Sequence, residues 1–360
     1  MRTLLMEHRP EGAALALLEG RELMDWRLVP EQGLQAETVL VGRVRQNARG
    51  MAAAFVSLPE GQVGFLPESE AKQPLHPGDF VLVQVKKPAT GTKGPYLTQE
   101  ISLAGRGLIL LPLSTSIGVS SRVEDEGDRE ALKALALRLK PDSMGLIMRQ
   151  AARETGEAAL NEELARLQAR WETIQRAAEA PNGLRLLWRG RSALEQALED
   201  FGAIDRLILD REEPEAPAHE VLEHPFAAFA VEEQREKLCR RQVWLPSGGF
   251  VVVDPCEALT AIDVNTGKST GKKGADREQL FLRTNLEAAA MIARILRVRG
   301  AGGIVIIDFI DMEEEASRQQ ILDRFRALLR EDPVKCVVHG FTSLGLLEMT
   351  RKKTGRGTGP

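Results

Sequence analysis

The sequence predicts a multidomain protein that combines α+β and α/β structure. Its 360 residues exceed the usual size of one domain and can form several cores. In residues 36–105, short strand-like runs alternate with Gly, Pro and Asn turns, which is typical of a small barrel. In residues 250–309, two strand-like runs, an amphipathic helix and a third apolar run follow one another. That order indicates parallel strands joined by a right-handed crossover helix.

Residues 1–35 and 186–238 are expected to form one open sheet. The first part contains strand-like runs that are too few to be stable alone, so they need a partner from later in the chain. The second part supplies further strands and helices. The expected strands are Arg2–Glu7, Ala13–Leu18, Arg21–Leu28, Leu186–Trp188 and Arg206–Leu209, with helices at Arg191–Phe201 and Ala230–Arg240.

Residues 36–105 favour an OB-type barrel, a module that often binds RNA. Phe55 and Phe65 lie on two of its strands, separated by a turn near residues 59–61. Exposed aromatic rings in such barrels stack on bases, although both phenylalanines would serve equally well as core residues. The expected strands are Thr38–Val44, Ala52–Val56, Val63–Leu66, Phe80–Val85 and Tyr96–Ile101.

Residues 106–185 mix strands with two helices, the second of which turns Trp171 inward. Arg149 directly follows the strand Gly145–Met148. An arginine there can bind a phosphate through two hydrogen bonds, but an arginine after a strand is usually just solvated. The other expected elements are a strand at Gly107–Leu111 and helices at Asp128–Leu139 and Asn161–Ala178.

In residues 239–360, two aspartates end two strands of the predicted parallel pair. The apolar run Ile304–Phe309 suggests a strand covered on both faces, and Arg277–Arg299 is the crossover helix. Parallel strands end at one edge, so Asp263 and Asp308 should lie about 5 Å apart. Two carboxylates at that distance repel unless a cation or proton lies between them, and Mg²⁺ or Mn²⁺ suits such oxygen ligands.

A structural role for these aspartates is the alternative, because an aspartate after a buried strand often caps a helix. Asn265, two residues beyond Asp263 and on the same face, favours a site. The loop Thr266–Ala275 contains Gly267-Lys268-Ser269, but a nucleotide-binding P-loop also needs glycine where Ile262 stands. The loop therefore fits a contact to a polyanion better than a nucleotide cradle.

Composition bounds the class of partner and the compartment. With 48 basic and 52 acidic residues, the net charge of −4 requires any contact with RNA to be a local patch. Cys239, Cys256 and Cys336 have no zinc-site spacing and are typical of reduced thiols. There is no signal peptide and no long apolar run, so we expect a cytoplasmic protein.

Four ordered motifs together resemble the catalytic region of the ribonuclease E/G endoribonucleases. They are AIDVNTG (261–267), TNLEAA (284–289), GGIVIIDFIDM (302–312) and LGLLEMTRKK (344–353). The resemblance implies an RNase H-like subdomain, formed by residues 1–35 and 186–238. An OB-type RNA-binding barrel (36–105) and a 5′-sensor region (106–185) are inserted into it, and a DNase I-like catalytic subdomain (239–360) follows.

The resemblance also assigns residues to roles. Asp263 and Asp308 would hold the metal, with Asn265 orienting Asp308. Phe55 and Phe65 would stack on RNA, and Lys93, in the turn GTKGP, would contact its backbone. The residues implied for a 5′-monophosphate sensor are Arg149, Gln150 (where the family has threonine), Arg122 and Lys335.

The implied activity is Mg²⁺-dependent internal cleavage of single-stranded, A/U-rich RNA, giving 5′-phosphate and 3′-hydroxyl ends. It would serve RNA processing, such as rRNA maturation, and mRNA decay. A Cys-rich zinc linkage that joins subunits in the family has no counterpart before Pro360, so zinc is not implied and any homodimer would lack that link. The alternatives are a non-catalytic RNA-binding or scaffold protein of the same fold, and a phosphohydrolase acting on a small nucleotide.

Overall fold

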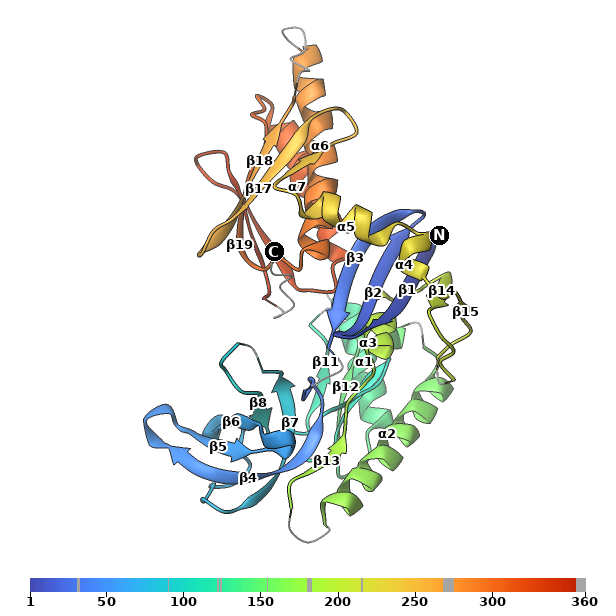
Figure 1. Cartoon of the computed structure of the whole chain (residues 1–360), viewed down its shortest axis with the longest axis vertical. Coiled ribbons are helices and arrows are strands. Elements are labelled where there is room, and N and C mark those ends of the chain that lie inside the picture. The colour runs from blue at the N-terminus through green and yellow to red at the C-terminus, as the bar shows by residue number, and fades with distance from the viewer. Residues whose placement is uncertain are drawn as a thin grey trace. The chain divides into compact units, whose positions relative to one another are not determined.

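The computed structural model divides the chain into two compact units (Figure 1). Unit 1 comprises Met1–Glu31 and Ala193–Pro360, and unit 2 comprises Gln32–Ser192. The structure describes residues 1–30, 33–89, 91–121, 123, 125–153, 155–179, 183–214, 216–267 and 275–353.

Unit 1 begins with the N-terminal sheet, whose strand order is β15-β14-β1-β2-β3. β14 pairs parallel with β1, so a strand far along the chain completes the sheet, as its small size required. Helix α3 (Ala193–Phe201) packs Leu194, Ala197 and Phe201 on one face. The strands are β1 (Arg2–Arg9), β2 (Gly12–Glu19), β3 (Glu22–Val29), β14 (Arg206–Leu209) and β15 (Glu220–Val221).

The second sheet of unit 1, called here the carboxylate sheet, has the order β16-β17-β18-β19-β21-β20. Its strands are β16 (Gln242–Trp244), β17 (Phe250–Pro255), β18 (Leu259–Asn265), β19 (Gly303–Asp308), β20 (Cys336–Phe341) and β21 (Leu347–Arg351). The predicted parallel pair is present: β18 and β19 are joined by the crossover helix α6 (Ala275–Val298). Helix α7 (Glu315–Arg330) packs beside α6.

Among the described residues, the helices and the core cover one face of the carboxylate sheet and leave the other open. Residues alternate along β19, with Val305 and Ile307 fully buried while Ile304 is 48% exposed. The expectation that the run Ile304–Phe309 is covered on both faces is therefore wrong. The reason is that the apolar faces of α6 and α7 join the same core as the buried side chains of the sheet, which leaves the opposite face of β19 open.

One core unites the two sheets of unit 1. Apolar side chains of β1, β2 and β3 share it with α6 and with the buried face of the carboxylate sheet. Two further helices, α4 (Pro225–Ala228) and α5 (Val231–Cys239), contribute Phe226, Val231 and Leu238. The buried face of the carboxylate sheet thus packs against a continuous apolar core.

Unit 2 contains the predicted barrel, in which β4, β5, β6, β8 and β7 pair in that order and β7 closes on β4. Alternate residues fill its interior, among them Ala54, Val56 and Leu66. The strands are β4 (Val39–Ala48), β5 (Ala53–Ser57), β6 (Val63–Pro67), β7 (Phe80–Lys87) and β8 (Tyr96–Thr98).

Beside the barrel, unit 2 has a smaller sheet of order β11-β12-β10-β9 that packs against two helices. Trp171 on the second helix is 5% exposed, so it faces inward as expected. The elements are β9 (Leu103–Ala104), β10 (Leu108–Leu111), β11 (Ile117–Val119), β12 (Gly145–Met148), α1 (Glu126–Leu139) and α2 (Glu157–Ala178).

Two expectations about individual segments are wrong. The strand expected at Leu186–Trp188 does not join the N-terminal sheet: as β13 (Arg185–Trp188) it pairs antiparallel with β4 of unit 2. The basic run at residues 351–356 predicts a frayed tail, but Arg351 ends β21 and is buried, with its guanidinium 2.8 Å and 3.1 Å from the carboxylate oxygens of Asp332. Among the described residues, no helix is long and apolar enough to span a membrane.

Candidate functional site

The backbone register of β18 and β19 places two carboxylates side by side. Asp263 and Asp308 are direct partners in the parallel pair and are the last partners of that ladder. Both side chains are exposed, on the open face of the carboxylate sheet. The buried residues on either side of Asp263, Ile262 and Val264, anchor the strand in the core and so hold Asp263 outward.

The charge at this pair is not compensated. Partial burial raises the pKa of Asp308, and the neighbouring carboxylates of Asp263 and Asp311 raise it further. In the part of the chain that the structure describes, no Lys or Arg forms an ion pair with Asp263 or Asp308. Two adjacent carboxylates without a basic partner fit a divalent cation.

The set of protein ligands at the pair is small. The described residues contain no cluster of three or more His, Cys, Asp or Glu side chains that could hold a metal. Mg²⁺ is commonly bound by one or two carboxylates, with waters and substrate phosphates completing its coordination, whereas a structural zinc site needs four protein ligands. Asp263 and Asp308 therefore suit a hard cation that also contacts a substrate.

Asn265 lies on the same face as the carboxylates, but its contact differs from the expected one. Its side-chain amide donates a hydrogen bond to Asp263, with 2.7 Å between Nδ2 and Oδ2. The expectation was an interaction with Asp308. Residues two apart on one strand are close neighbours on the same face, so the nearer carboxylate accepts the hydrogen bond.

Two polar residues of α6 hold loops at this edge of the sheet, and they were not singled out from the sequence. Asn285 is fully buried, and its amide both donates to and accepts from the backbone of Ile310, at 2.8 Å and 3.0 Å. Glu287 accepts a 2.9 Å hydrogen bond from the backbone N–H of Ser247, in the turn before β17. Both belong to the motif TNLEAA, whose polar residues were the available signal.

The basic loop after β18 is described only at its start. Gly267 has a φ of +65°, and a Cβ there would lie 2.3 Å from the carbonyl oxygen of Gly248. Glycine is therefore required where this loop passes the turn before β17. Residues 268–274, which include Lys268 and Ser269 of the predicted polyanion contact, lie outside the described residues.

On the barrel of unit 2, Phe55 and Phe65 form an aromatic surface. They are direct partners across β5 and β6, both are partly exposed, and their ring centroids are 5.9 Å apart in an edge-to-face arrangement. Neither belongs to the barrel core. Tyr96, missed in the sequence because it is a lone tyrosine, extends this surface: its ring centroid lies 6.0 Å from that of Phe65.

Lys93 is exposed in the turn between β7 and β8. The next residue, Gly94, passes so close to β6 that a Cβ would lie 2.0 Å from the carbonyl oxygen of Val63. The backbone N–H of Phe65 donates to the carbonyl of Pro95 at 2.8 Å. The turn that carries Lys93 is therefore fixed against the strand that carries Phe65.

The predicted sensor residues are divided between the two units. Arg149 follows β12 and donates a 2.9 Å hydrogen bond from Nη1 to the carbonyl of Gly105, while Gln150 beside it is exposed. Arg122 lies outside the described residues. Lys335 is exposed just before β20 and belongs to unit 1. The sensor assignment thus remains a prediction.

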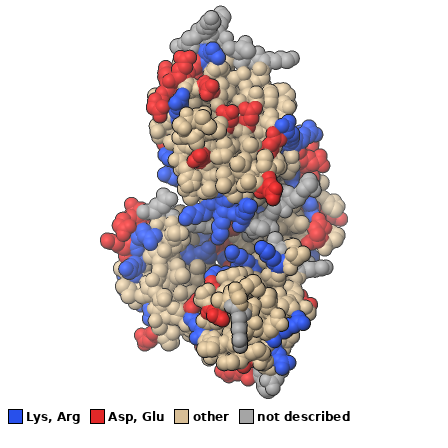
Figure 2. All heavy atoms as spheres, turned by 90° about the vertical axis from the view of Figure 1, so that its left-hand side faces the viewer, with Lys and Arg blue, Asp and Glu red and all other residues tan. Residues whose placement is uncertain are grey.

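Charged side chains are gathered in groups on the surface. On the face drawn in Figure 2, groups of Lys and Arg alternate with groups of Asp and Glu. Groups of basic side chains are therefore present on this face, although the whole chain is nearly balanced in charge.

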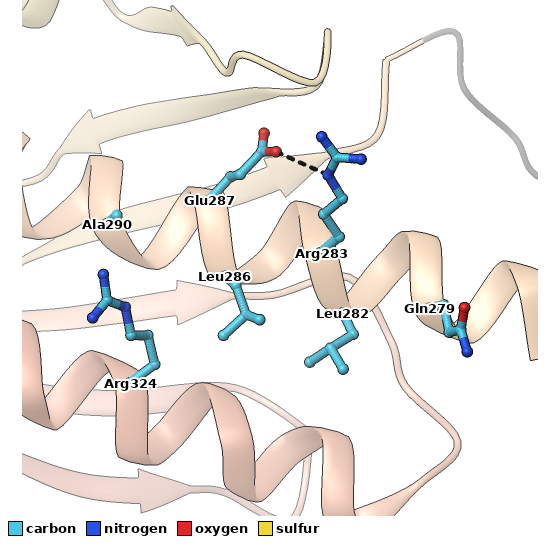
Figure 3. Close-up of a pocket in the computed structure, with 7 residues that line it drawn as sticks. All are labelled: Gln279, Leu282, Arg283, Leu286, Glu287, Ala290 and Arg324. Atoms are coloured by element: carbon cyan, nitrogen blue, oxygen red, sulfur yellow. Dashed lines mark hydrogen bonds and ion pairs between the residues drawn. The ribbon is translucent and has the colours of Figure 1, made fainter.

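A hollow of about 470 Å³ lies between α6 and α7 (Figure 3). Leu282 and Leu286 point into it, and Arg283 pairs with Glu287 at its rim, with 3.4 Å between Nε and Oε1. Of the predicted site residues that the structure describes, none lines this hollow. It belongs to the helical layer, whereas Asp263 and Asp308 lie on the open face of the sheet.

Comparison with known proteins identifies the family. Residues 102–354 match the sequence profile of the ribonuclease E/G family. The chain is 34% identical to ribonuclease G of Escherichia coli, in an alignment that covers 98% of this chain and 80% of the relative. It is 35% identical to ribonuclease E of Nostoc sp., over 89% of this chain and 52% of the relative. The chain belongs to the ribonuclease E/G family.

The share of a relative's length that this chain spans differs from one relative to another. The chain spans about half of the Nostoc ribonuclease E and 42% of ribonuclease E of Haemophilus influenzae, to which it is 32% identical. It spans most of the Escherichia coli ribonuclease G. The activity and partners of the whole relatives are therefore taken up below as proposals.

Proposed function

We propose that this chain is a metal-dependent endoribonuclease that cleaves single-stranded RNA at the Asp263–Asp308 pair. The observation that carries the proposal is the placement of these two carboxylates side by side on an open sheet face, without a basic partner in the described chain. The relatives named ribonuclease G and ribonuclease E support it.

The residues at the pair have separate roles. Asp263 and Asp308 would hold a divalent cation, for which Mg²⁺ is the first choice and Mn²⁺ the second. When bound, such a cation supplies polarisation of the scissile phosphate and acidification of a water molecule. The hydrogen bond from Asn265 orients the carboxylate of Asp263. Asn285 fixes the backbone at Ile310, two residues beyond Asp308.

The barrel would hold the RNA. Bases stack on the rings of Phe55 and Phe65, and the ammonium group of Lys93 pairs with a backbone phosphate. Stacking requires unpaired bases, so the substrate is single-stranded, and the weak pairing of A/U-rich segments makes them the best candidates. Products with 5′-phosphate and 3′-hydroxyl ends, and roles in rRNA maturation and mRNA decay, follow from the family.

Four further assignments are part of the same proposal. Arg149 and Gln150, with Arg122 and Lys335, would bind a 5′-monophosphate. The N-terminal sheet would correspond to the RNase H-like subdomain and the carboxylate sheet to the DNase I-like subdomain. A cytoplasmic location remains a prediction of the sequence. So does a homodimer without a zinc linkage.

The test is cleavage of an internally labelled, A/U-rich RNA by the wild type and by Asp308→Asn, with and without Mg²⁺. Internal cuts that need Mg²⁺ and disappear in the variant are expected. A parallel comparison of 5′-monophosphate and 5′-hydroxyl RNA measures the contribution of Arg149 and Gln150. A folded wild type that binds RNA but does not cut it in Mg²⁺ or Mn²⁺ would refute the nuclease and favour an RNA-binding or scaffold protein.

A further inference from the structure

An exposed aromatic pair lies on the open face of the carboxylate sheet. Trp244, on the edge strand β16, is 62% exposed, whereas Trp26 and Trp171 are 8% and 5% exposed. Its ring meets that of Phe250 edge to face, with 5.3 Å between centroids. A tryptophan left this open is unusual, and large exposed apolar side chains mark binding surfaces.

The strand register places this pair beside the carboxylates. Trp244, Phe250 and Asn265 form one row across β16, β17 and β18. The neighbouring row of the sheet contains Val252, Asp263 and Asp308, and Asp263 lies two residues before Asn265 on β18. Side chains two residues apart point to the same face, and the hydrogen bond from Asn265 to Asp263 is an example. From strand spacing and rise, the Cα atoms of Phe250 and Asp263 lie about 8 Å apart.

The hairpin that carries the pair is held rigidly. The backbone N–H of Leu245 donates to the carbonyl of Gly249, and that of Gly248 donates to the carbonyl of Leu245, at 2.8 Å and 3.0 Å. The carboxylate of Glu287 on α6 holds the turn at Ser247. Because the hairpin is already ordered, little conformational entropy is lost when a ligand binds to these rings. The pair is therefore preorganised for contact with a planar group.

We propose that Trp244 and Phe250 form a stacking site for a base that flanks the scissile phosphate, which adds a second aromatic contact to that of the barrel. This inference rests on the proposed nuclease function. A base suits the site because every base has a π face, and its own phosphate can lie at the neighbouring carboxylate pair.

A second copy of the chain is the competing occupant, and the charges disfavour it. A protein surface over this face would bury Asp263 and Asp308 together with the aromatic pair. Burying carboxylates without partners is costly, and a two-fold contact would place the same acidic groups near one another. RNA avoids this cost because the cation that neutralises the carboxylates also contacts the phosphate.

The test uses binding of an A/U-rich single-stranded RNA to proteins that all carry Asp308→Asn, so that no cleavage interferes. Trp244→Leu keeps an apolar side chain but removes the π face, and should weaken binding about 5- to 150-fold. Trp244→Phe keeps a ring and should bind within about threefold of the parent. Ile304→Ala, another exposed apolar residue on the same face, is the matched control and should change nothing.

Tryptophan fluorescence gives a second readout. RNA should quench the emission of the parent protein, and the quenched fraction should fall in Trp244→Phe even though binding is retained. Equal affinity of Trp244→Leu and the parent, in a chain whose wild type cleaves RNA, would overturn the stacking site and leave the nuclease standing. A wild type that does not cleave, combined with weakened binding by Trp244→Leu, would refute the nuclease and retain the stacking site.

Sedimentation of the same proteins without RNA tests the competing occupant. The stacking site predicts that Trp244→Leu leaves the oligomeric state unchanged. A dimer that dissociates in this variant, together with unchanged RNA affinity, would assign the aromatic pair to contact between copies and overturn the proposal.

Discussion

The aromatic surface of the barrel and the carboxylate pair of unit 1 are built in the same way, but their neighbouring side chains interact with opposite sign. Each consists of side chains that strand register aligns on an outward face: Phe55 opposite Phe65 in one, Asp263 beside Asp308 in the other. The two rings attract each other in their edge-to-face contact. The two carboxylates repel, and this repulsion adds to partial burial in raising the pKa of Asp308.

This difference indicates which region can bind alone and which needs a cofactor. The barrel surface is stable as it stands and offers apolar faces to a base. The carboxylate pair is a destabilising arrangement that becomes favourable only when a cation is present. RNA affinity and RNA cleavage should therefore be separable by mutation, because they depend on different residues.

The largest effect is expected for Asp263→Asn. Loss of a metal ligand removes several kcal/mol of transition-state stabilisation, so cleavage at saturating protein should fall at least about 10³-fold. RNA affinity should stay within about twofold, because the barrel is unchanged. Gel analysis of the products measures the loss.

A matched control for this variant is Asp254→Asn. Asp254 is an aspartate of the same sheet that is ion-paired with Arg241 rather than placed beside a second carboxylate. Its rate should equal that of the wild type. Equal losses in the two variants would show that the effect is not specific to the metal pair.

Phe65→Ala should produce the opposite pattern. Removing one stacking ring should weaken RNA binding about 5- to 150-fold, with little change in the rate at saturation. Phe65→Tyr keeps the ring and should retain affinity. Fluorescence anisotropy with a labelled RNA measures the affinity of both variants. Unchanged binding by Phe65→Ala would contradict a contact between Phe65 and RNA.

Asn265→Ala tests how the carboxylate is oriented. Loss of a hydrogen bond to a metal ligand typically costs about 10- to 100-fold in metal affinity or activity. Because the effect acts through the metal, higher Mg²⁺ should restore the rate. A loss that is the same at every Mg²⁺ concentration would contradict an orienting role for Asn265.

The segments that could be predicted from the sequence are those whose pattern has one solution. The parallel pairing of Asp263 and Asp308 followed from a strand, a helix and a strand of the right lengths, because the crossover then has a fixed hand. The barrel strands followed from the turns between them. Phe55 and Phe65 could be located on adjacent strands, but only the structure placed them outside the barrel core.

The features that sequence could not give depend on distant neighbours. The apolar run Ile304–Phe309 shows no alternation of apolar and polar residues. The sequence therefore does not reveal that α6 and α7 both pack on the same face of the sheet. A short strand such as β13 carries no mark of its partner. Arg351 resembles a solvated tail residue until Asp332, which is far from it in sequence, is placed beside it.

A smaller effect concerns stability without metal. Asp308→Asn removes the repulsion from Asp263, and at the water-like dielectric of an exposed pair this is worth about 1 kcal/mol. Urea unfolding in EDTA should therefore show a more stable variant. Added Mg²⁺ should stabilise the wild type and leave the variant unchanged; stabilisation of both equally would place the cation elsewhere.

The smallest effect concerns the support of the β16–β17 hairpin by Glu287. Burial raises the pKa of this carboxyl, but hydrogen bonds from Ser247 and Arg283 outweigh it, so the pKa is lowered from its usual 4.5. A lowered pKa stabilises the fold above pH 4.5, and this stabilisation is lost as the pH falls through the folded-state value. Glu287→Gln should cost about 1 kcal/mol at pH 7 and less at pH 3. Urea midpoints at the two pH values measure the difference. An equal cost at both pH values would show that the charge of Glu287 is not the source of the stabilisation.

The most direct measurement is the single-turnover cleavage rate of one A/U-rich RNA as a function of protein concentration, for the wild type, Phe65→Ala and Asp308→Asn. Division of binding and cleavage between the barrel and the carboxylate pair predicts that Phe65→Ala raises the half-saturating concentration and keeps the plateau. It predicts that Asp308→Asn abolishes the plateau while RNA affinity, measured by anisotropy in the same samples, is retained. A Phe65→Ala variant that lowers the plateau, or an Asp308→Asn variant that still cleaves, would contradict it.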